Sequence, residues 1–457
     1  MSERLVVIGG DAAGMSAASQ VRRRRGPQDL EIVAFERGHY TSYSACGIPY
    51  YVGEVVPELE RLIMRRPEEF RERLAIDVRM QQEVVELDTD KRAVKVVDGN
   101  GNEYWEGFDQ VVVATGAKPI RPPLQGSDAA NIFGVQTLDH GVAIERAVEG
   151  QRPRHAVVVG GGYIGLEMAE AFKMRGLDVA IVEAASQVMS TLDPDMGSLV
   201  TDKIRSMDIA VHTEEPVASF ETTDGRVSAV VTEGRTLPAD IVVLGLGVKP
   251  NSDLARDAEV GVGVTGAIAV DRRMRTGTDG VWAAGDCAEK FHLVSRRPVA
   301  IALGTHANKE GRVAGINIGG GYATFPGVLG TAVSRICELE VGRTGLKESE
   351  ALDAGFEILT TTIDSTTRAG YFPGAAPIKT KLIVERRSGR LLGAQIIGEE
   401  GAAKRIDVIA AALWNDMTVD DMLNMDLSYA PPFAPVWDPV LIAARKSWQA
   451  VEEDMTS

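Results

Sequence analysis

Two short apolar runs, about 150 residues apart, share one plan along the chain. Residues 5–8 lead into a glycine-rich turn, and a helical pattern follows to about residue 25. Residues 156–159 lead in the same way into a second glycine-rich turn and a helical pattern to about residue 175. A continuous apolar run followed by a helical period is typical of a buried parallel strand in a βαβ unit. The pattern therefore predicts an α/β fold that contains two such units.

Further apolar runs end in small residues, at residues 110–117, 240–247 and 280–286. Small residues at a strand end let a ligand approach the backbone closely. After about residue 325 the pattern changes to alternating apolar and polar positions, at residues 331–341, 379–384 and 391–397. Alternation indicates antiparallel strands, and a helical period near residues 402–414 follows them. We therefore expect a separate C-terminal α+β domain.

The charge balance narrows the kinds of partner. Lysine and arginine total 49 and aspartate and glutamate total 65, which gives a formal net charge of −16. A field of this sign argues against nonspecific binding to nucleic acid or to anionic lipid. No apolar run reaches the roughly 18 residues that a membrane span needs, and residues 1–4 lead into the first strand without a signal-peptide pattern. We expect a soluble, cytoplasmic protein without a nucleic-acid or membrane partner.

The two glycine-rich turns carry the first chemical signal. The second, residues 160–165, has the full G-x-G-x-x-G pattern, whereas the first, residues 9–14, has Asp11 at the middle glycine position. Such a turn places a pyrophosphate at the N-terminus of a helix, where free N–H groups and the helix dipole favour negative charge. Each unit also has a second strand that ends in a glutamate, Glu36 or Glu183, which suits a ribose diol. Two copies predict two dinucleotides in one chain.

These turns, together with Ala114-Thr115-Gly116, Gly245-Leu246-Gly247-Val248-Lys249-Pro250-Asn251 and Ala283-Ala284-Gly285-Asp286-Cys287, stand in the order of a known family. Over essentially the whole chain they resemble the FAD- and NAD(P)-dependent pyridine nucleotide-disulfide oxidoreductases. The resemblance implies two Rossmann-like domains, with an FAD domain (residues 1–115 and 249–325) split by an NAD(P) domain (residues 116–248). It also implies a C-terminal dimerisation domain (residues 326–457) and a homodimer.

The resemblance assigns cofactor contacts to matching positions. For FAD these are Gly9, Asp11, Ala13, Gly14, Glu36, Arg37, Thr115, Gly116, Gly285, Asp286 and Thr305. For the nicotinamide cofactor they are Gly160, Gly162, Tyr163, Ile164, Gly165, Glu183 and Gly247. No arginine or lysine follows Glu183 in residues 184–189, so nothing there would balance the 2′-phosphate of NADPH. We therefore predict a preference for NADH.

Cysteine usage points to a single redox thiol. The dithiol members of the family carry C-x-x-x-x-C after the first unit, but residues 42–51 contain only Cys46. Glycine and proline just after it predict a helix N-terminus, which would stabilise a thiolate; a buried structural cysteine is the alternative. Cys287 and Cys337 lie in strand-like stretches and are interpreted as small core residues. The 3 cysteines and 6 histidines lack metal-site spacing, so no metal is predicted.

Single-cysteine members include NADH oxidases, NADH peroxidases and coenzyme A-disulfide reductases. The oxidases and peroxidases have a histidine in the first glycine turn, which is absent here, and no histidine follows His306 to form the C-terminal acid–base pair of dithiol reductases. The chain is most similar to coenzyme A-disulfide reductases, which use two tyrosines. The matching residues are Tyr371, before Phe-Pro-Gly, and Tyr429, before Ala-Pro-Pro. A phenol can protonate a departing thiolate; aromatic packing is the alternative role.

The resemblance also implies coenzyme A contacts at Ser16, Gln20, Arg23 and Ser42. The first three are spaced i, i+4, i+7 and form one stripe of the first helix. Arginines 22–25 add a basic patch, for which a solvated helix end is the alternative. Ala45 and Leu74 depart from the family's asparagine and lysine at these positions, and Arg71 and Arg73 could compensate.

The sequence thus predicts an NADH-dependent flavoprotein that reduces coenzyme A disulfide or a related small disulfide through Cys46. Tyr371, with Tyr429 from the partner subunit, would protonate the thiolate that leaves. An NADH oxidase or a polysulfide or persulfide reductase of the same family is an alternative enzyme. The alternative from another class of protein is a flavoprotein redox sensor that turns over slowly.

Overall fold

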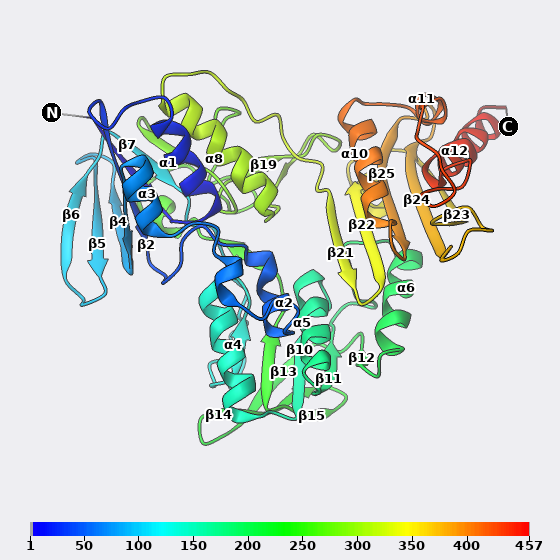
Figure 1. Ribbon diagram of the computed structural model, residues 1–457, viewed down its shortest axis with the longest axis horizontal. Helices are drawn as coiled ribbons and strands as arrows, with labels where there is room; N and C mark the ends of the chain where they lie inside the picture. The colour runs from blue at the N-terminus through cyan, green and yellow to red at the C-terminus, as the bar shows by residue number, and fades with distance from the viewer. Residues whose placement is uncertain (1–2, 457) are drawn as a thin grey trace.

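Three five-stranded sheets organise residues 3–456, the part of the chain that the computed structural model describes (Figure 1). Two of the sheets are parallel and belong to doubly wound α/β units, and the third is antiparallel and C-terminal. The predicted fold class is confirmed. No helix among the described residues is long and apolar enough to cross a membrane.

The first parallel sheet draws its strands from both halves of the chain. Its order is β18 (Val281–Ala283), β7 (Gln110–Val113), β1 (Glu3–Ile8), β2 (Leu30–Glu36) and β3 (Ile76–Met80). Helices α1 (Ala12–Arg22) and α8 (Gly304–Ile318) pack against one another beside it. Chain order reverses on the two sides of β1, and such a switch point opens a crevice at the carboxyl ends of the strands.

The second parallel sheet repeats this arrangement. Its order is β12 (Ala210–His212), β11 (Asp178–Val182), β10 (His155–Val159), β16 (Ile241–Leu244) and β9 (Ile132–Gly134). Its helices are α4 (Leu138–Gln151), α5 (Tyr163–Met174) and α6 (Pro194–Arg205). The switch point lies at β10, so the second glycine turn has the same setting as the first.

Short elements connect the two units. The chain passes from one unit to the other through β8 (Ala117–Pro119) and returns through β17 (Val248–Pro250), and these two strands pair antiparallel. Each unit also carries a three-stranded antiparallel sheet. The strands are β4 (Gln82–Asp88), β5 (Ala93–Asp98) and β6 (Glu103–Gly107) in the first unit, and β13 (Val217–Thr223), β14 (Arg226–Thr232) and β15 (Thr236–Pro238) in the second.

The C-terminal sheet has the order β21 (Ala332–Ile336), β22 (Leu339–Gly345), β25 (Leu391–Gly398), β24 (Pro377–Glu385) and β23 (Ile358–Thr366). A 3-10 turn η3 (Ala403–Arg405) leads into α10 (Ile406–Trp414), as the helical period predicted. Helices α11 (Val419–Leu423) and α12 (Pro439–Thr456) complete the domain. Strand β23 was not predicted, because several of its positions are polar and the alternation of apolar and polar residues is weak there.

Several local predictions need correction. The alternation at residues 331–341 is a hairpin, with Cys337 in its turn at a φ of 59°, and not one strand. Cys287 is buried as predicted, but it lies in the turn after β18, where its thiol contacts the carbonyl of Val113. Helix α1 ends at Arg22 and not near residue 25.

A buried polar cluster fastens the C-terminal domain to the second unit. The ammonium of Lys381, only 4% exposed, lies 2.7 Å from a carboxylate oxygen of Asp195 and 2.5 Å from one of Glu348. Asp193, which precedes α6, exchanges two hydrogen bonds with Gln395 of β25, at 2.9 and 2.6 Å. Buried charges of this kind are tolerated only when paired and hydrogen-bonded. The cluster therefore holds the two domains in a defined relation.

Candidate active site

The first glycine turn is shaped for a close approach between backbones. Gly9 has a φ of +111°, and a Cβ there would lie 2.2 Å from the carbonyl oxygen of Ala114. A Cβ on Gly14 would lie 2.0 Å from the carbonyl oxygen of Gly9. Glycine is therefore required at both positions. Asp11 takes the N-cap position of α1 but makes no side-chain capping bond, so its carboxylate does not fill the helix terminus.

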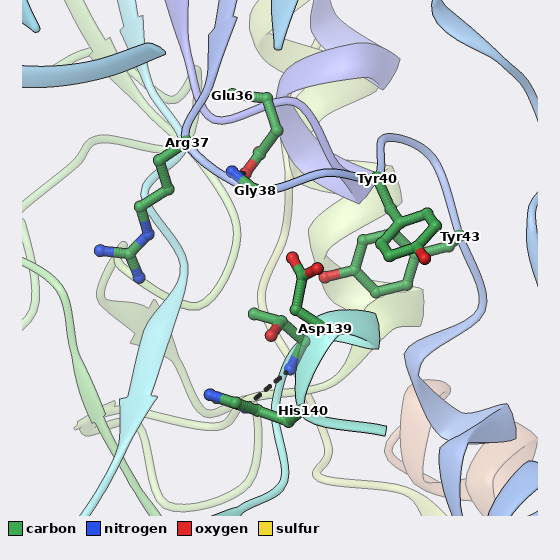
Figure 2. Close-up of a pocket in the computed structure, with 8 residues that line it drawn as sticks. Glu36, Arg37, Gly38, Tyr40, Tyr43, Asp139 and His140 are labelled. Atoms are coloured by element: carbon green, nitrogen blue, oxygen red, sulfur yellow. Dashed lines mark hydrogen bonds between the residues drawn. The ribbon is translucent and has the colours of Figure 1, made fainter. Parts of the chain in front are cut away.

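Glu36 ends β2 and binds back to the turn. Its carboxylate accepts hydrogen bonds from the amides of Gly10 at 2.8 Å and Gly38 at 2.7 Å. A cavity of about 240 Å³ opens beside it, between the end of β2 and the start of α4 (Figure 2). The cavity is lined by Glu36, Arg37, Gly38, Tyr40, Tyr43, Thr137, Asp139 and His140. Arg37 extends away from the two tyrosines, toward Glu83 at 3.5 Å.

The turn after β18 meets the first glycine turn. Gly285 has a φ of +87°, and a Cβ there would lie 2.8 Å from the Cβ of Ala13. Its amide donates to Glu310 of α8 at 2.8 Å, and the ammonium of Lys290 donates to its carbonyl oxygen at 2.8 Å. Lys290 and Glu310 are 1% and 0% exposed, so this pair fixes the turn from below. Neither residue was singled out from the sequence, because nothing local distinguishes them from surface charges.

Three carboxyl groups converge on the crevice of the first unit. Burial, with smaller contributions from the neighbouring Glu36 and Asp286, raises the pKa of Asp11 from 3.8 to about 7. Burial also raises the pKa of Asp286, whose Oδ1 is buried without a hydrogen-bond partner. An unpaired buried oxygen carries a penalty that a ligand hydroxyl can relieve.

These features fit FAD. The glycine cradle and the uncapped α1 terminus suit its pyrophosphate, Glu36 suits its adenosine ribose, and the orphan oxygen of Asp286 suits a ribityl hydroxyl. Thr115 and Gly116 join the cradle to the returning linker, since Asn251 donates to the Thr115 carbonyl at 2.9 Å and to the Gly116 carbonyl at 2.9 Å. Thr305 is exposed in the first turn of α8. The individual FAD contacts stay predictions.

The second glycine turn has the same construction. Gly160 has a φ of +102°, and a Cβ on Gly165 would lie 2.0 Å from its carbonyl oxygen. Glu183 accepts from the amides of Gly161 at 2.7 Å and Ala185 at 2.8 Å. Gly162 is the N-cap of α5, again without a side-chain capping bond. The terminus and the glutamate are thus disposed as in the first unit, which suits a second dinucleotide.

The remaining predicted nicotinamide-site residues surround this turn. Tyr163 starts α5, and its buried hydroxyl has no hydrogen-bond partner within standard geometry. Ile164 is 37% exposed, and Gly247 follows β16 with a φ of +84°. Glu215 lies next to this edge, since its amide donates to the carbonyl of Glu183 at 3.0 Å, and its carboxylate binds the guanidinium of Arg235 at 2.9 and 2.6 Å.

Cys46 lies in a 3-10 turn, η1 (Ala45–Gly47), that continues into α2 (Ile48–Val52), so the predicted helix start is present. The thiol is exposed, unlike that of a structural cysteine. However, partial burial raises its pKa, and the carboxylates of Glu167, Asp286 and Asp11 raise it further. In the protein alone, burial and these negative charges therefore oppose the thiolate that the helix start was expected to stabilise.

Glu167 is a site residue that sequence reasoning missed. It lies on α5, four residues after Tyr163, and burial raises its pKa. It accepts a hydrogen bond from Ser334 of β21 at 2.8 Å. The thiol is thus influenced by Asp286 from the first unit and by Glu167 from the second, between the two cofactor sites. The signal that could have found Glu167 is its place on the inner face of a helix that begins at a dinucleotide turn.

The residues predicted to contact coenzyme A differ in their hydrogen bonds and backbone conformation. Ser16 donates to Asn308 of α8 at 2.8 Å. Asn308 therefore lies next to the stripe of predicted coenzyme A contacts on α1. Gln20 lies beside Arg23, whose guanidinium donates to it at 3.4 Å. Ser42 has a φ of 52°, and its amide donates to the carbonyl of Gly10 at 3.2 Å.

The basic patch is smaller than its sequence suggests. Arg22 is buried and donates to carbonyls of Leu30 and Ala75 at 2.9 and 3.0 Å, and Arg25 pairs with Glu3. Arg71 and Arg73 pair with carboxylates of their own helix, α3 (Pro67–Leu74), so they are poor substitutes for the family's lysine. Arg23 and Arg24 are the exposed arginines of the run at residues 22–25.

Tyr371 and Tyr429 come together, although 58 positions separate them in the sequence. A side-chain hydrogen bond to Tyr371 raises the pKa of Tyr429. The two side chains are 77% and 46% exposed, which packing residues within one chain would not be. Their loops follow β23 and α11 of the C-terminal domain, and these two elements lie apart from α2 of the same chain (Figure 1). The pair is therefore placed for a site other than Cys46 of its own chain.

Known proteins share this architecture throughout. Residues 3–311 match the family described as pyridine nucleotide-disulphide oxidoreductase, and residues 331–439 match its dimerisation domain. The chain is 41% identical to a CoA-dependent NAD(P)H sulfur oxidoreductase of Pyrococcus abyssi, over 97% of this chain and 98% of that one. It is 36% identical to an NADH oxidase of Methanocaldococcus jannaschii, over 96% and 98% of the two chains.

A coenzyme A disulfide reductase of Staphylococcus epidermidis is 27% identical over 94% of this chain and 96% of that one. The solved structure of an NAD-dependent persulfide reductase from A. fulgidus superposes with a TM-score of 0.95 and 39% identity, covering 98% of this chain and 84% of that one. The family uses FAD and NAD(P)H, in agreement with the two dinucleotide sites. The chain belongs to the pyridine nucleotide-disulphide oxidoreductase family.

Proposed function

We propose that the protein is an FAD-dependent, NADH-consuming reductase of sulfur–sulfur bonds in coenzyme A disulfide or in coenzyme A persulfides. The exposed thiol of Cys46 carries the proposal, because carboxylates of both dinucleotide-binding units influence it. Cys287 is buried and Cys337 lies in the β21–β22 turn, so Cys46 has the properties of a single redox thiol. The printed names of the relatives support a substrate linked to coenzyme A.

The chemistry balances with one thiol. The thiolate of Cys46 attacks one sulfur of the substrate, forming a mixed disulfide and releasing the other sulfur as a thiolate that takes a proton. FAD held at the first glycine turn would supply, at Cys46, the two electrons that come from NADH. This regenerates the Cys46 thiolate and releases the second thiol. The sum is NADH, one proton and a disulfide giving NAD⁺ and two thiols; a coenzyme A persulfide gives coenzyme A and hydrogen sulfide.

The proton source in this proposal is the pair Tyr371 and Tyr429 of the partner subunit. A dimerisation domain supports a homodimer, and the exposure of both phenols leaves them free to meet a neighbouring chain. Tyr429 holds its proton more tightly than an isolated phenol because of its bond to Tyr371. It is therefore protonated at neutral pH and can donate when a basic thiolate forms beside it.

Oxygen reduction is the second candidate, favoured by the resemblance to an NADH oxidase. The first glycine turn has Asp11-Ala12-Ala13 and no histidine to protonate an oxygen species. A redox sensor is a further alternative, which rapid NADH consumption without a protein partner would oppose. The expectations of a cytoplasmic location and of no nucleic-acid or membrane partner stay predictions.

The test compares NADH consumption by the holoenzyme with coenzyme A disulfide, coenzyme A persulfide or oxygen as the only acceptor. We expect sulfur compounds to be reduced much faster than oxygen. Mass analysis of the protein mixed with substrate should find an adduct of coenzyme A mass on Cys46. Cys46→Ser should bind FAD and lose turnover, since serine neither ionises near pH 7 nor forms a disulfide; Cys337→Ser is the matched control. Turnover retained in Cys46→Ser, or oxygen as the preferred acceptor, would contradict the proposal.

A further inference from the structure

Two loops of the C-terminal domain present the tyrosine pair. Residues 367–376 connect β23 to β24 and carry Tyr371, and residues 424–438 connect α11 to α12 and carry Tyr429. The loop tips are exposed, but their bases are not: Thr367 is 2% exposed, Ala369 4% and Ala434 3%. The amide of Ala369 donates to the carbonyl of Pro431 at 3.1 Å and joins the loops directly.

The guanidinium of Arg405 holds both loops from beneath. Arg405 ends the η3 turn, and its side chain is 11% exposed. One terminal nitrogen, Nη2, donates to the carbonyl of Thr367 at 2.9 Å and to the carbonyl of Phe433 at 2.7 Å. Nε donates to the carboxylate of Asp438 at 3.0 Å, and Nη1 donates to the carbonyl of Gly401 at 2.6 Å.

We propose that Arg405 is a positioning residue, which sets the separation and direction of Tyr371 and Tyr429 so that they can protonate the leaving thiolate. Arg405 has no described bond to either phenol, so it acts through the two loop backbones. The inference rests on the proposed function, because it supposes that the tyrosine pair serves as the proton donor.

The chemistry of the guanidinium explains why arginine occupies this position. Its planar group directs several N–H donors at fixed angles, so it can bind three carbonyls and a carboxylate at once. Gly370 and Gly374 flank Tyr371, and Gly374 has a φ of +78°, so the first loop has little intrinsic stiffness. Proton transfer requires donor and acceptor within hydrogen-bond reach, and displacements near 1 Å can cost about 10²-fold in rate.

The experiment separates the two half-reactions of holoenzyme carrying Arg405→Lys. Lysine keeps the charge but cannot reproduce the fork. Reduction of the flavin by NADH should be unchanged, whereas reoxidation by coenzyme A disulfide should slow roughly tenfold or more. The KM for the disulfide should change little, because the predicted coenzyme A contacts lie on α1 and at Ser42. Arg386→Lys, which alters an arginine paired with Asp454 elsewhere in the domain, is the matched control and should leave both rates unchanged.

A double-variant cycle tells positioning from general structural damage. If Arg405 acts through the tyrosines, adding Arg405→Lys to the Tyr371→Phe/Tyr429→Phe protein should cause no further loss of reoxidation rate. An equal loss in both backgrounds, or an unchanged rate in Arg405→Lys itself, would overturn the inference while leaving the proposed function intact. Wild-type rates in the double phenylalanine protein would overturn both the tyrosine assignment and the role of Arg405. Absence of turnover with both coenzyme A disulfide and coenzyme A persulfide in the unmodified enzyme would refute the proposed function.

Should Arg405→Lys fold poorly, hydrogen exchange in Asp438→Asn supplies the second measurement. That variant removes the charged partner of Nε while keeping Arg405. The inference expects faster exchange of the Ala369 amide, which bridges the loops, together with slower flavin reoxidation. Unchanged exchange and unchanged reoxidation would overturn it.

Discussion

Carboxylates set the electrostatic state of the residues around Cys46. Burial opposes ionisation of its thiol, and Glu167, Asp286 and Asp11 add to that effect, so in the protein alone the thiol form is favoured at neutral pH. A mixed disulfide carries no such charge and escapes this repulsion. The same surroundings therefore disfavour a resting thiolate but put no such charge penalty on the thiol or on a mixed disulfide.

Tyr429→Phe tests the proton donor at the residue scale. Removing the phenol should slow release of the first thiol by about 10²–10⁴, if it acts as a general acid. Flavin reduction by NADH should not change, since that step does not use the pair. Rapid mixing of reduced enzyme with coenzyme A disulfide measures the first rate. The control is Tyr322→Phe, because Tyr322 is 78% exposed and lies outside the tyrosine pair. A wild-type rate in Tyr429→Phe would leave Tyr429 only a packing role.

We expect Asp11 to make FAD binding sensitive to pH. The pKa of Asp11 is raised to about 7, so its contribution to stability is full below 3.8 and is lost as pH rises through about 7. A pyrophosphate beside it would raise this pKa further and couple binding to proton uptake. We expect the affinity for FAD to fall by up to about tenfold per pH unit above pH 7.

Titrating the protein freed of FAD with the cofactor, at several pH values, measures this dependence. Asp11→Asn should flatten it because the amide does not titrate. Asn100→Asp, which adds a carboxylate in the exposed loop between β5 and β6, is the control for a general charge effect. An affinity that is independent of pH in the unmodified protein would contradict the expectation.

At the scale of elements, the two parallel units share one design. A strand, a glycine turn and an uncapped helix are followed by a second strand whose terminal glutamate accepts an amide of that turn, from Gly10 in the first unit and Gly161 in the second. This bond aims the carboxylate into the crevice before any ligand arrives, which lowers the cost of ordering it on binding.

The loop after β11 should make the enzyme prefer NADH. Glu183 would repel a 2′-phosphate, and Arg235 is engaged by Glu215. We expect kcat/KM to favour NADH by roughly tenfold or more. Glu183→Ala combined with Ala184→Arg, at an exposed position, should shift the ratio toward NADPH because it removes the repulsion and supplies a cation. Glu183→Gln removes the charge but keeps the shape of the side chain, so it tests the charge alone. A preference of the unmodified enzyme for NADPH would refute the predicted preference for NADH.

At the scale of the whole molecule, Cys46 and the tyrosine pair lie on separate parts of one chain. The C-terminal sheet reaches its own thiol site through the bond of Ser334 to Glu167, whereas the loops of Tyr371 and Tyr429 follow β23 and α11, which lie apart from α2 (Figure 1). A complete site in the proposed function therefore needs two chains. Isologous pairing in a twofold dimer would complete both sites at once.

Mixed dimers test this sharing of sites. One chain carries Cys46→Ser and the other carries Tyr371→Phe and Tyr429→Phe, so each homodimer lacks an essential group. Random exchange after mild unfolding should restore about a quarter of wild-type disulfide turnover, because half of the dimers then contain one complete site. Mixing two preparations of the Cys46→Ser chain is the control. If activity does not return although mixed dimers are detected, thiol and phenols do not meet across the interface.

The sequence by itself determined the two βαβ units, their glycine turns, the C-terminal α+β domain and the single thiol after the first unit. These features are local: an apolar run, a positive φ at Gly9 or Gly160 and a helical period are set by residues near one another in the chain. The domain boundaries at residues 115, 248 and 325 and the individual site residues stay predictions.

Tertiary structure decided the charges around the candidate site and the contacts that hold its turns and loops in place. The raised pKa of Cys46 depends on Glu167, the hold on Gly285 depends on Glu310, and the tyrosine loops depend on Arg405. Each of these contacts joins residues that are 25 or more positions apart in the sequence. A local pattern carries no information about burial or about which distant charge arrives, and burial and distant charge set the pKa of a thiol and the rigidity of a loop.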